Sequence, residues 1–116
     1  MVDSFRDLIV WQRSFQLSIA IYRLTVVFPK EEIYGLTSQL RRAGVSVASN
    51  IAEGYGRGST GEYKQFLAMA RGSNLEVQTQ LLIAKELGFG APEKLQIAEQ
   101  FSHEVGKMLV AMLNKL

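Results

Sequence analysis

The sequence contains no cysteine, and only two prolines and one histidine occur among its 116 residues. Without cysteine there can be no disulfide, zinc–thiolate centre, iron–sulfur cluster or cysteine nucleophile. Long hydrophobic runs are also missing, since no stretch approaches the ~18 apolar residues of a membrane span. The first residues include acidic side chains and lack the apolar core of a secretory signal. These absences predict a cytoplasmic protein that does not associate with a membrane.

The residues that are present have the composition of a folded protein. Hydrophobic residues make up 47% of the chain and charged residues 21%, which is enough apolar material for a substantial core. A chain of this length suits one domain with a radius of roughly 13 Å. We therefore expect a single domain over residues 1–116, with no internal repeat.

Apolar residues recur at helical spacing in four segments that are separated by helix breakers. Pro29 ends the first segment, Gly54 the second and Gly88 the third, whereas Pro92 suits the first turn of the fourth. The predicted helices cover residues 5–28, residues 34–53, the residues after Ser59 up to 87, and the segment that starts at 92. Long helices joined by short loops predict an all-α, antiparallel up-down-up-down four-helix bundle. The spacing of Ser59 and Glu62 predicts a capping box at the start of the third helix.

The first predicted helix carries two apolar stripes on opposite sides. One stripe consists of Leu8, Trp11, Phe15, Ile19, Tyr22 and Val26, and the other of Val10, Leu17, Ile21, Leu24 and Phe28. The second helix has a core stripe of Leu36, Leu40, Val47 and Ile51, and places Gly44, Val45, Ala48 and Ala52 away from it. A helix of a monomeric bundle buries one face only, and the loops are too short to cover the other. The second stripe therefore predicts a homo-oligomer.

Polar side chains interrupt the apolar stripes at Asn50 and Asn74. A buried amide needs hydrogen-bond partners, and we expect the two amides either to pair with each other or to bond to Ser46, Ser73 or Gln80. A structural role in fixing helix register is favoured over the alternative of a ligand pocket. Two acidic residues nearby, Glu53 and Glu76, are expected to form ion pairs with Arg41, Arg42 or Arg71 rather than to perform acid–base chemistry.

Positive charge is concentrated in the middle of the chain, although the net charge is only +2. Five basic residues against two acidic ones lie between positions 41 and 71, whereas the first 32 residues sum to zero. The basic residues are Arg41, Arg42, Arg57, Lys64 and Arg71. A basic surface of this kind is a candidate site for the phosphate backbone of RNA or DNA. The alternative is an ordinary solvated helix surface, because the excess is small for a nucleic-acid-binding domain.

No combination of residues predicts a reaction centre. Gly56, Gly58 and Gly61 match G-x-G-x-x-G, but a predicted helix precedes them where the dinucleotide fingerprint requires a strand. The single histidine, His103, cannot supply the two Glu-x-x-His motifs of a di-iron bundle. A serine–histidine–aspartate triad would have to recruit Asp3 or Asp7 from the start of the chain. We therefore expect no enzymatic activity, no cofactor and no metal.

Several longer motifs resemble one protein family. FRDLIVWQ at 5–12 and IYRLTVVFP at 21–29 are followed by YGLTSQLRRA, SNIAEGYGR, EYKQFL and ARGSNLEVQTQL between residues 34 and 81. Together they resemble the four-helix-bundle proteins encoded in intervening sequences of bacterial 23S ribosomal RNA genes. The resemblance implies a bundle that assembles into pentameric rings. It extends to the accessory variability protein of diversity-generating retroelements, a basic pentameric barrel that binds nucleic acid and a reverse transcriptase.

The resemblance makes nucleic acid the leading partner, because the small basic excess of one chain would be multiplied in a ring. The sequence thus predicts a non-enzymatic homo-oligomer, with a pentamer favoured, that binds RNA or DNA through the five basic residues. The competing hypothesis is a scaffold that binds only protein.

Overall fold

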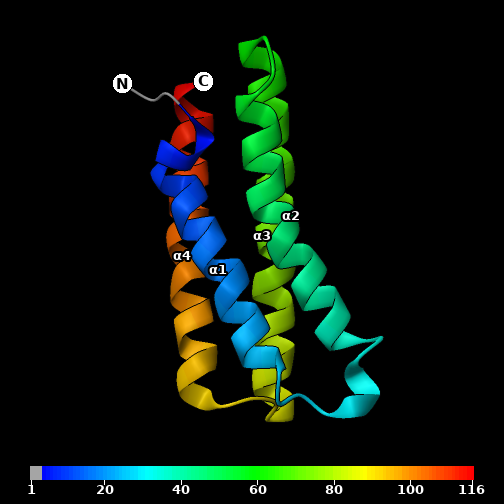
Figure 1. Ribbon diagram of the computed structural model, residues 1–116. Helices are drawn as coiled ribbons and strands as arrows, with labels where there is room; N and C mark the ends of the chain where they lie inside the picture. Colours follow the sequence, from blue (N-terminus) through cyan, green and yellow to red (C-terminus); the bar gives the residue numbers. More distant parts are fainter. Residues whose placement is uncertain (1–3) are drawn as a thin grey trace.

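The computed structural model describes residues 4–116, which form four α-helices and two single 3-10 turns. The helices are α1 (Ile9–Thr25), α2 (Leu36–Tyr55), α3 (Thr60–Leu87) and α4 (Pro92–Lys115), and the turns are η1 (Phe5–Asp7) and η2 (Lys30–Glu32). Figure 1 shows the helices side by side in alternating directions. Each helix packs against the next one along the chain, and α1 also packs against α4. The predicted antiparallel four-helix bundle is confirmed.

The predicted stop and start signals act at three of the helix ends. Ser59 Oγ accepts a hydrogen bond of 3.2 Å from the backbone N–H of Glu62 and donates one to the Glu62 carboxylate. Gly88 has φ 73°, the left-handed conformation that closes α3 at low cost for glycine. Pro92 occupies the first turn of α4, where a missing N–H is tolerated. Local chemistry therefore defines the connection between α3 and α4 and the start of α3.

The predicted span of the first helix, residues 5–28, is too long at both ends. Leu8 is extended, with φ −72° and ψ 124°, and it separates the η1 turn from α1. At the other end α1 stops at Thr25, and the N–H of Phe28 bonds to the Thr25 carbonyl in a turn. The residue before a proline is driven away from the helical region, which explains why the helix does not reach Phe28.

Two glycines of α2 were wrongly interpreted from the sequence. Gly54 was expected to end the helix, but it lies inside α2 and is buried, with an added Cβ only 2.7 Å from the Cβ of Phe66. Gly44 was expected to face away from the core, but it is also buried, and a Cβ there would meet Ile21 Cδ1 at 2.7 Å. Both glycines are therefore close-packing positions, one against α3 and the other against α1.

The fully buried core is built from one of the two apolar stripes of α1, and of the other stripe only its first residues, Leu8 and Trp11, pack half-buried against that core. Leu17, Ile21 and Leu24 are fully buried, together with aliphatic residues from the other three helices. The expected core stripe of α2 is buried at Leu40, Val47 and Ile51. The second stripe of α1 remains largely at the surface, with Phe15 49% exposed and Val26 72% exposed. The helix therefore presents an apolar face that residues 4–116 leave uncovered.

Candidate functional site

The five predicted cations do not share one surface, and Arg41 is committed to packing inside the chain. Its Nε donates a 2.9 Å hydrogen bond to Thr25 Oγ1, and its guanidinium lies 4.7 Å from the centre of the Tyr22 ring. Thr25 Oγ1 in turn donates to the Ile21 carbonyl at 2.8 Å. Arg41 therefore ties α2 to the end of α1, because its Nε and one face of its guanidinium are engaged by residues of α1.

Arg57 lies in the turn between α2 and α3, and carboxylates oppose its charge. Its guanidinium is 2.7 Å from Glu53 and 3.8 Å from Glu62, and it lies 4.8 Å from the centre of the Phe66 ring. The prediction that Glu53 pairs with Arg41, Arg42 or Arg71 is therefore wrong. Glu53 pairs instead with Arg57, four residues later in the chain, and this spacing favours ion pairs.

Arg42, Lys64 and Arg71 are exposed, and none of them has an ion pair or side-chain hydrogen bond within residues 4–116. They point to different surroundings. Arg42 lines a groove between α2 and α3 together with Glu76 and Gln80. Arg71 lines a groove between α3 and α4 together with His103 and Lys107. These three cations are therefore available to a ligand, but they are dispersed around the bundle.

Asn74 forms a reciprocal pair of hydrogen bonds with Ser102 inside the core. Its side chain is 1% exposed, and its Nδ2 donates a 3.0 Å hydrogen bond to the Ser102 carbonyl. Ser102 Oγ donates a 2.9 Å bond back to Asn74 Oδ1. Ser102 was not among the expected partners. The sequence could have predicted that Ser102 is buried, because its spacing from Ala98, Val105 and Leu109 places it on the buried face of α4. The pair joins α3 to α4.

Asn50 lies at the half-buried boundary between α2 and α3. Its Nδ2 donates to both the carbonyl and the hydroxyl of Ser46, at 2.9 and 3.0 Å, so the expected partner is confirmed. Ser46 Oγ also lies 2.9 Å from Ser73 Oγ, which continues the network onto α3. Next to it, Gln80 is 9% exposed and donates a long 3.4 Å bond to Gln39. Glu76 is exposed at the edge of the same groove and has no ion pair in the described chain.

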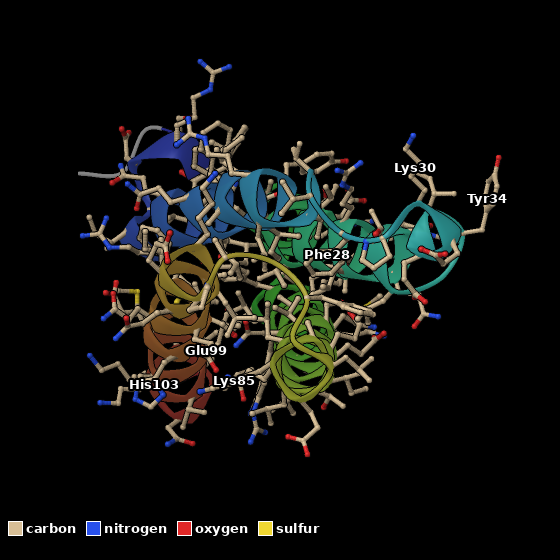
Figure 2. All side chains as sticks on the ribbon, turned by 90° about the horizontal axis from the view of Figure 1, so that it is seen from below. Phe28, Lys30, Tyr34, Lys85, Glu99 and His103 are labelled. Atoms are coloured by element: carbon tan, nitrogen blue, oxygen red, sulfur yellow. The ribbon has the colours of Figure 1, made fainter. Side chains whose placement is uncertain are left out.

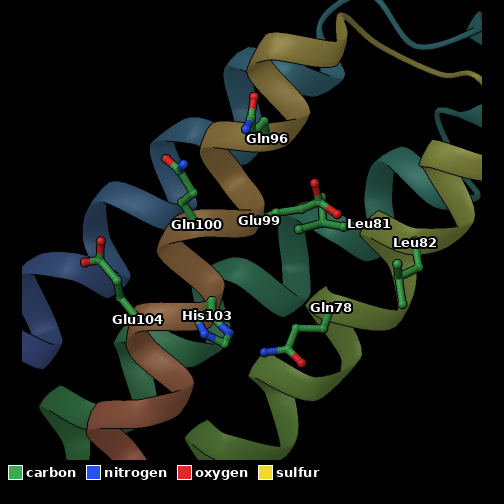
Figure 3. Close-up of a pocket in the computed structure, with 8 residues that line it drawn as sticks. All are labelled: Gln78, Leu81, Leu82, Gln96, Glu99, Gln100, His103 and Glu104. Atoms are coloured by element: carbon green, nitrogen blue, oxygen red, sulfur yellow. The ribbon is translucent and has the colours of Figure 1, made fainter.

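Another groove lies between α3 and α4, with a volume of about 750 Å³, and Figure 3 shows eight side chains that line it. Amides and carboxylates surround the exposed His103, and Lys85 pairs with Glu99 at 3.8 Å across the two helices. None of the side chains is a hydroxyl or thiol that His103 could activate. Asp3, one of the two aspartates considered for a triad, lies outside the described residues. Within residues 4–116 no group of three or more His, Asp or Glu side chains is placed to hold a metal ion.

Comparison with protein families decides which group the chain falls into. The family described as 23S rRNA-intervening sequence protein matches residues 6–111. The chain belongs to this family. The resemblance seen in the sequence motifs is thereby confirmed.

The fold of this intervening-sequence family member is shared by a solved crystal structure. That structure is described as a protein with unknown function from the S23 ribosomal protein family of Bacteroides thetaiotaomicron. The two chains superpose with a TM-score of 0.80 at 20% sequence identity, over 90% of this chain and 98% of the other. No curated protein is similar enough to count as a match. The likeness establishes the four-helix fold and assigns no biochemical activity.

The most distinctive surface of this 23S rRNA-intervening sequence family member is apolar. A groove of about 400 Å³ lies between α1 and α4, and we call it the α1–α4 groove. It is lined by Phe15, Gln16, Ile19, Ala20, Arg23, Lys94, Ile97 and Phe101. Phe15 and Ile19 belong to the exposed stripe of α1, so the groove continues that face onto α4. In the part of the chain that is described, no helix is long and apolar enough to cross a membrane.

Proposed function

We propose that this protein is a non-enzymatic helical bundle that assembles with copies of itself. The observation that carries the proposal is the second apolar stripe of α1, on which Phe15, Tyr22 and Val26 remain 49%, 44% and 72% exposed. Several exposed apolar side chains along one helix face are typical of protein interfaces. The resemblance to pentameric relatives favours a closed ring of five copies. The groove around His103 has no hydroxyl or thiol in its lining, and residues 4–116 hold no group of three or more His, Asp or Glu that could bind a metal ion, which is consistent with a binding role.

The assembly can be tested by light scattering after size exclusion of nuclease-treated protein. We expect the wild-type chain to elute with several times the mass of one chain. Ile19→Asp places a charge in the middle of the exposed stripe without touching the buried one, and it should reduce the mass to that of one chain. Thr79→Asp, at an exposed position of α3, serves as the matched control and should leave the mass unchanged. A wild-type protein that elutes as a single chain at tens of micromolar would refute the proposal.

A second candidate function is RNA or DNA binding, and it is favoured by the three exposed cations that have no partner within the described residues. Arg42, Lys64 and Arg71 keep their charge available, whereas Arg41 and Arg57 are engaged by Thr25, Glu53 and Glu62. In a ring, each free cation would be repeated once per copy. Salt-dependent binding to phosphates would follow from the release of counterions.

This binding is tested by fluorescence anisotropy with a structured RNA at two salt concentrations. If Arg42 and Arg71 contact phosphates, then Arg42→Glu and Arg71→Glu should each weaken binding and reduce the salt slope by about one for each lost contact. Lys115→Glu, an exposed cation at the end of α4, is the control and should have little effect. An assembled protein with no salt-dependent affinity for RNA or DNA would leave a scaffold that binds only protein.

A further inference from the structure

The connection between α1 and α2 projects sideways from the lower end of the bundle (Figure 1). Its end holds Lys30, Glu31, Glu32, Ile33 and Tyr34, and we call these residues the α1–α2 tip. Tyr34 is 95% exposed and Ile33 is 51% exposed. An isolated exposed tyrosine needs no explanation, but here the preceding residue is a second exposed apolar side chain, and Figure 2 shows Tyr34 projecting at the edge of the molecule.

Hydrogen bonds order the backbone of the tip although its side chains are exposed. The backbone N–H of Glu32 bonds to the Pro29 carbonyl at 2.9 Å, and that of Gly35 bonds to the Glu32 carbonyl at the same distance. Glu32 Oε1 also accepts a 3.0 Å bond from the N–H of Leu36 and thus supports the first turn of α2. A segment whose backbone is already ordered loses less conformational entropy when a partner covers it. Tyr34 therefore has the properties of an interface anchor.

The charges of the tip and of the α1–α4 groove are opposite. The tip carries two carboxylates and one ammonium group, and the Glu31 carboxylate has no partner among the described residues. The α1–α4 groove has an apolar floor and two cations, Arg23 and Lys94, and no acidic residue lines it. Neither cation forms an ion pair within residues 4–116. Complementary charge favours one docking orientation and disfavours contact between like surfaces.

The two surfaces also lie on opposite sides of the molecule. In Figure 2 the labelled Lys30 and Tyr34 stand beyond α2 on one side, whereas α1 and α4 lie toward the other. A contact between two different surfaces of the same chain is heterologous, and it produces a closed ring when the rotation between successive copies closes. The placement therefore suits a head-to-tail arrangement rather than a two-fold dimer.

We propose that the α1–α2 tip of one copy docks into the α1–α4 groove of the next copy. Tyr34 and Ile33 pack on Phe15, Ile19, Ile97 and Phe101, and Glu31 lies near Arg23 and Lys94. This inference rests on the proposed self-assembly and specifies its interface. An aromatic side chain buries roughly 150–250 Å² on docking, so Tyr34 supplies much of the apolar contact.

Two variants test the interface separately. The tip variant combines Tyr34→Ala with Glu31→Gln, which removes the aromatic ring and a negative charge without adding a positive one, and the groove variant combines Arg23→Glu with Lys94→Glu. All four positions are exposed, so the fold is not expected to change. Each variant alone should have the mass of one chain by light scattering under conditions where the wild type is oligomeric. Lys107→Glu, a charge reversal on α4 outside the α1–α4 groove, is the control and should keep the wild-type mass.

Mixing the two variants gives a result that other interfaces do not explain. The intact tip of the groove variant meets the intact groove of the tip variant, and no further copy can be added. The mixture should therefore form a species of twice the monomer mass and no larger one. This interface would be refuted if the variants kept the wild-type mass or if their mixture remained monomeric. The proposal of self-assembly would still hold in that case, provided that the wild type is oligomeric. A monomeric wild type would instead defeat the self-assembly proposal itself.

Discussion

At the scale of single residues, the reciprocal pair of Asn74 and Ser102 is the contact whose loss should be costly. Ser102→Ala leaves the Oδ1 of a nearly fully buried amide without its donor. An unsatisfied buried acceptor costs about 1–3 kcal/mol. We expect the free energy of unfolding, measured by urea titration at pH 7, to fall by that amount.

The matched control for this prediction is Thr79→Ala. Thr79 also sits on a helix and donates to a carbonyl, that of Leu75 at 2.9 Å, but it is exposed, so water can replace its hydroxyl. Its removal should change the free energy of unfolding by less than about 0.5 kcal/mol. Equal effects of the two substitutions would show that the contact of Asn74 with Ser102 does not stabilise the fold.

At the scale of helices, the sequence predicted the number, direction and several ends of the elements because local chemistry sets them. Gly88 and Pro92 act through their own backbone preferences, and these do not depend on the rest of the fold. Gly54 was misinterpreted for the opposite reason. Its role depends on the approach of Phe66 from α3, and a spacing rule within one segment contains no information about that contact.

The two stripes of α1 show a similar limit. Both are apolar and both repeat with helical spacing, so periodicity predicted two faces but could not say which one the other helices would cover. The structure buries the face with Leu17, Ile21 and Leu24.

The candidate site was predictable only as a set of residue types. Arg41 and Arg42 are neighbours in sequence and thus point about 100° apart on the helix, which places one on the α1 side and the other on the α3 side.

At the scale of the whole molecule, the bundle is slender, at 43 × 24 × 22 Å. Many of its large apolar side chains are exposed rather than buried in the core. Assembly that buries the exposed stripe would stabilise the folded chain by mass action. The thermal midpoint of the wild type should therefore rise with protein concentration. A tenfold increase contributes at most about 1.4 kcal/mol per chain, which corresponds to a shift of a few degrees for a domain of this size.

The tip variant with Tyr34→Ala and Glu31→Gln tests whether the contact between tip and groove causes this rise of the thermal midpoint. Because both side chains are exposed, their replacement should leave the stability of the isolated bundle nearly unchanged. Differential scanning fluorimetry from 2 to 200 μM should then show a midpoint that rises with concentration for the wild type and stays constant for the variant. Two parallel rising curves would place the stabilising contact elsewhere on the surface. If the midpoint of neither protein changed with concentration, and the wild type melted at the same temperature as the variant, assembly would not contribute to the stability of the bundle.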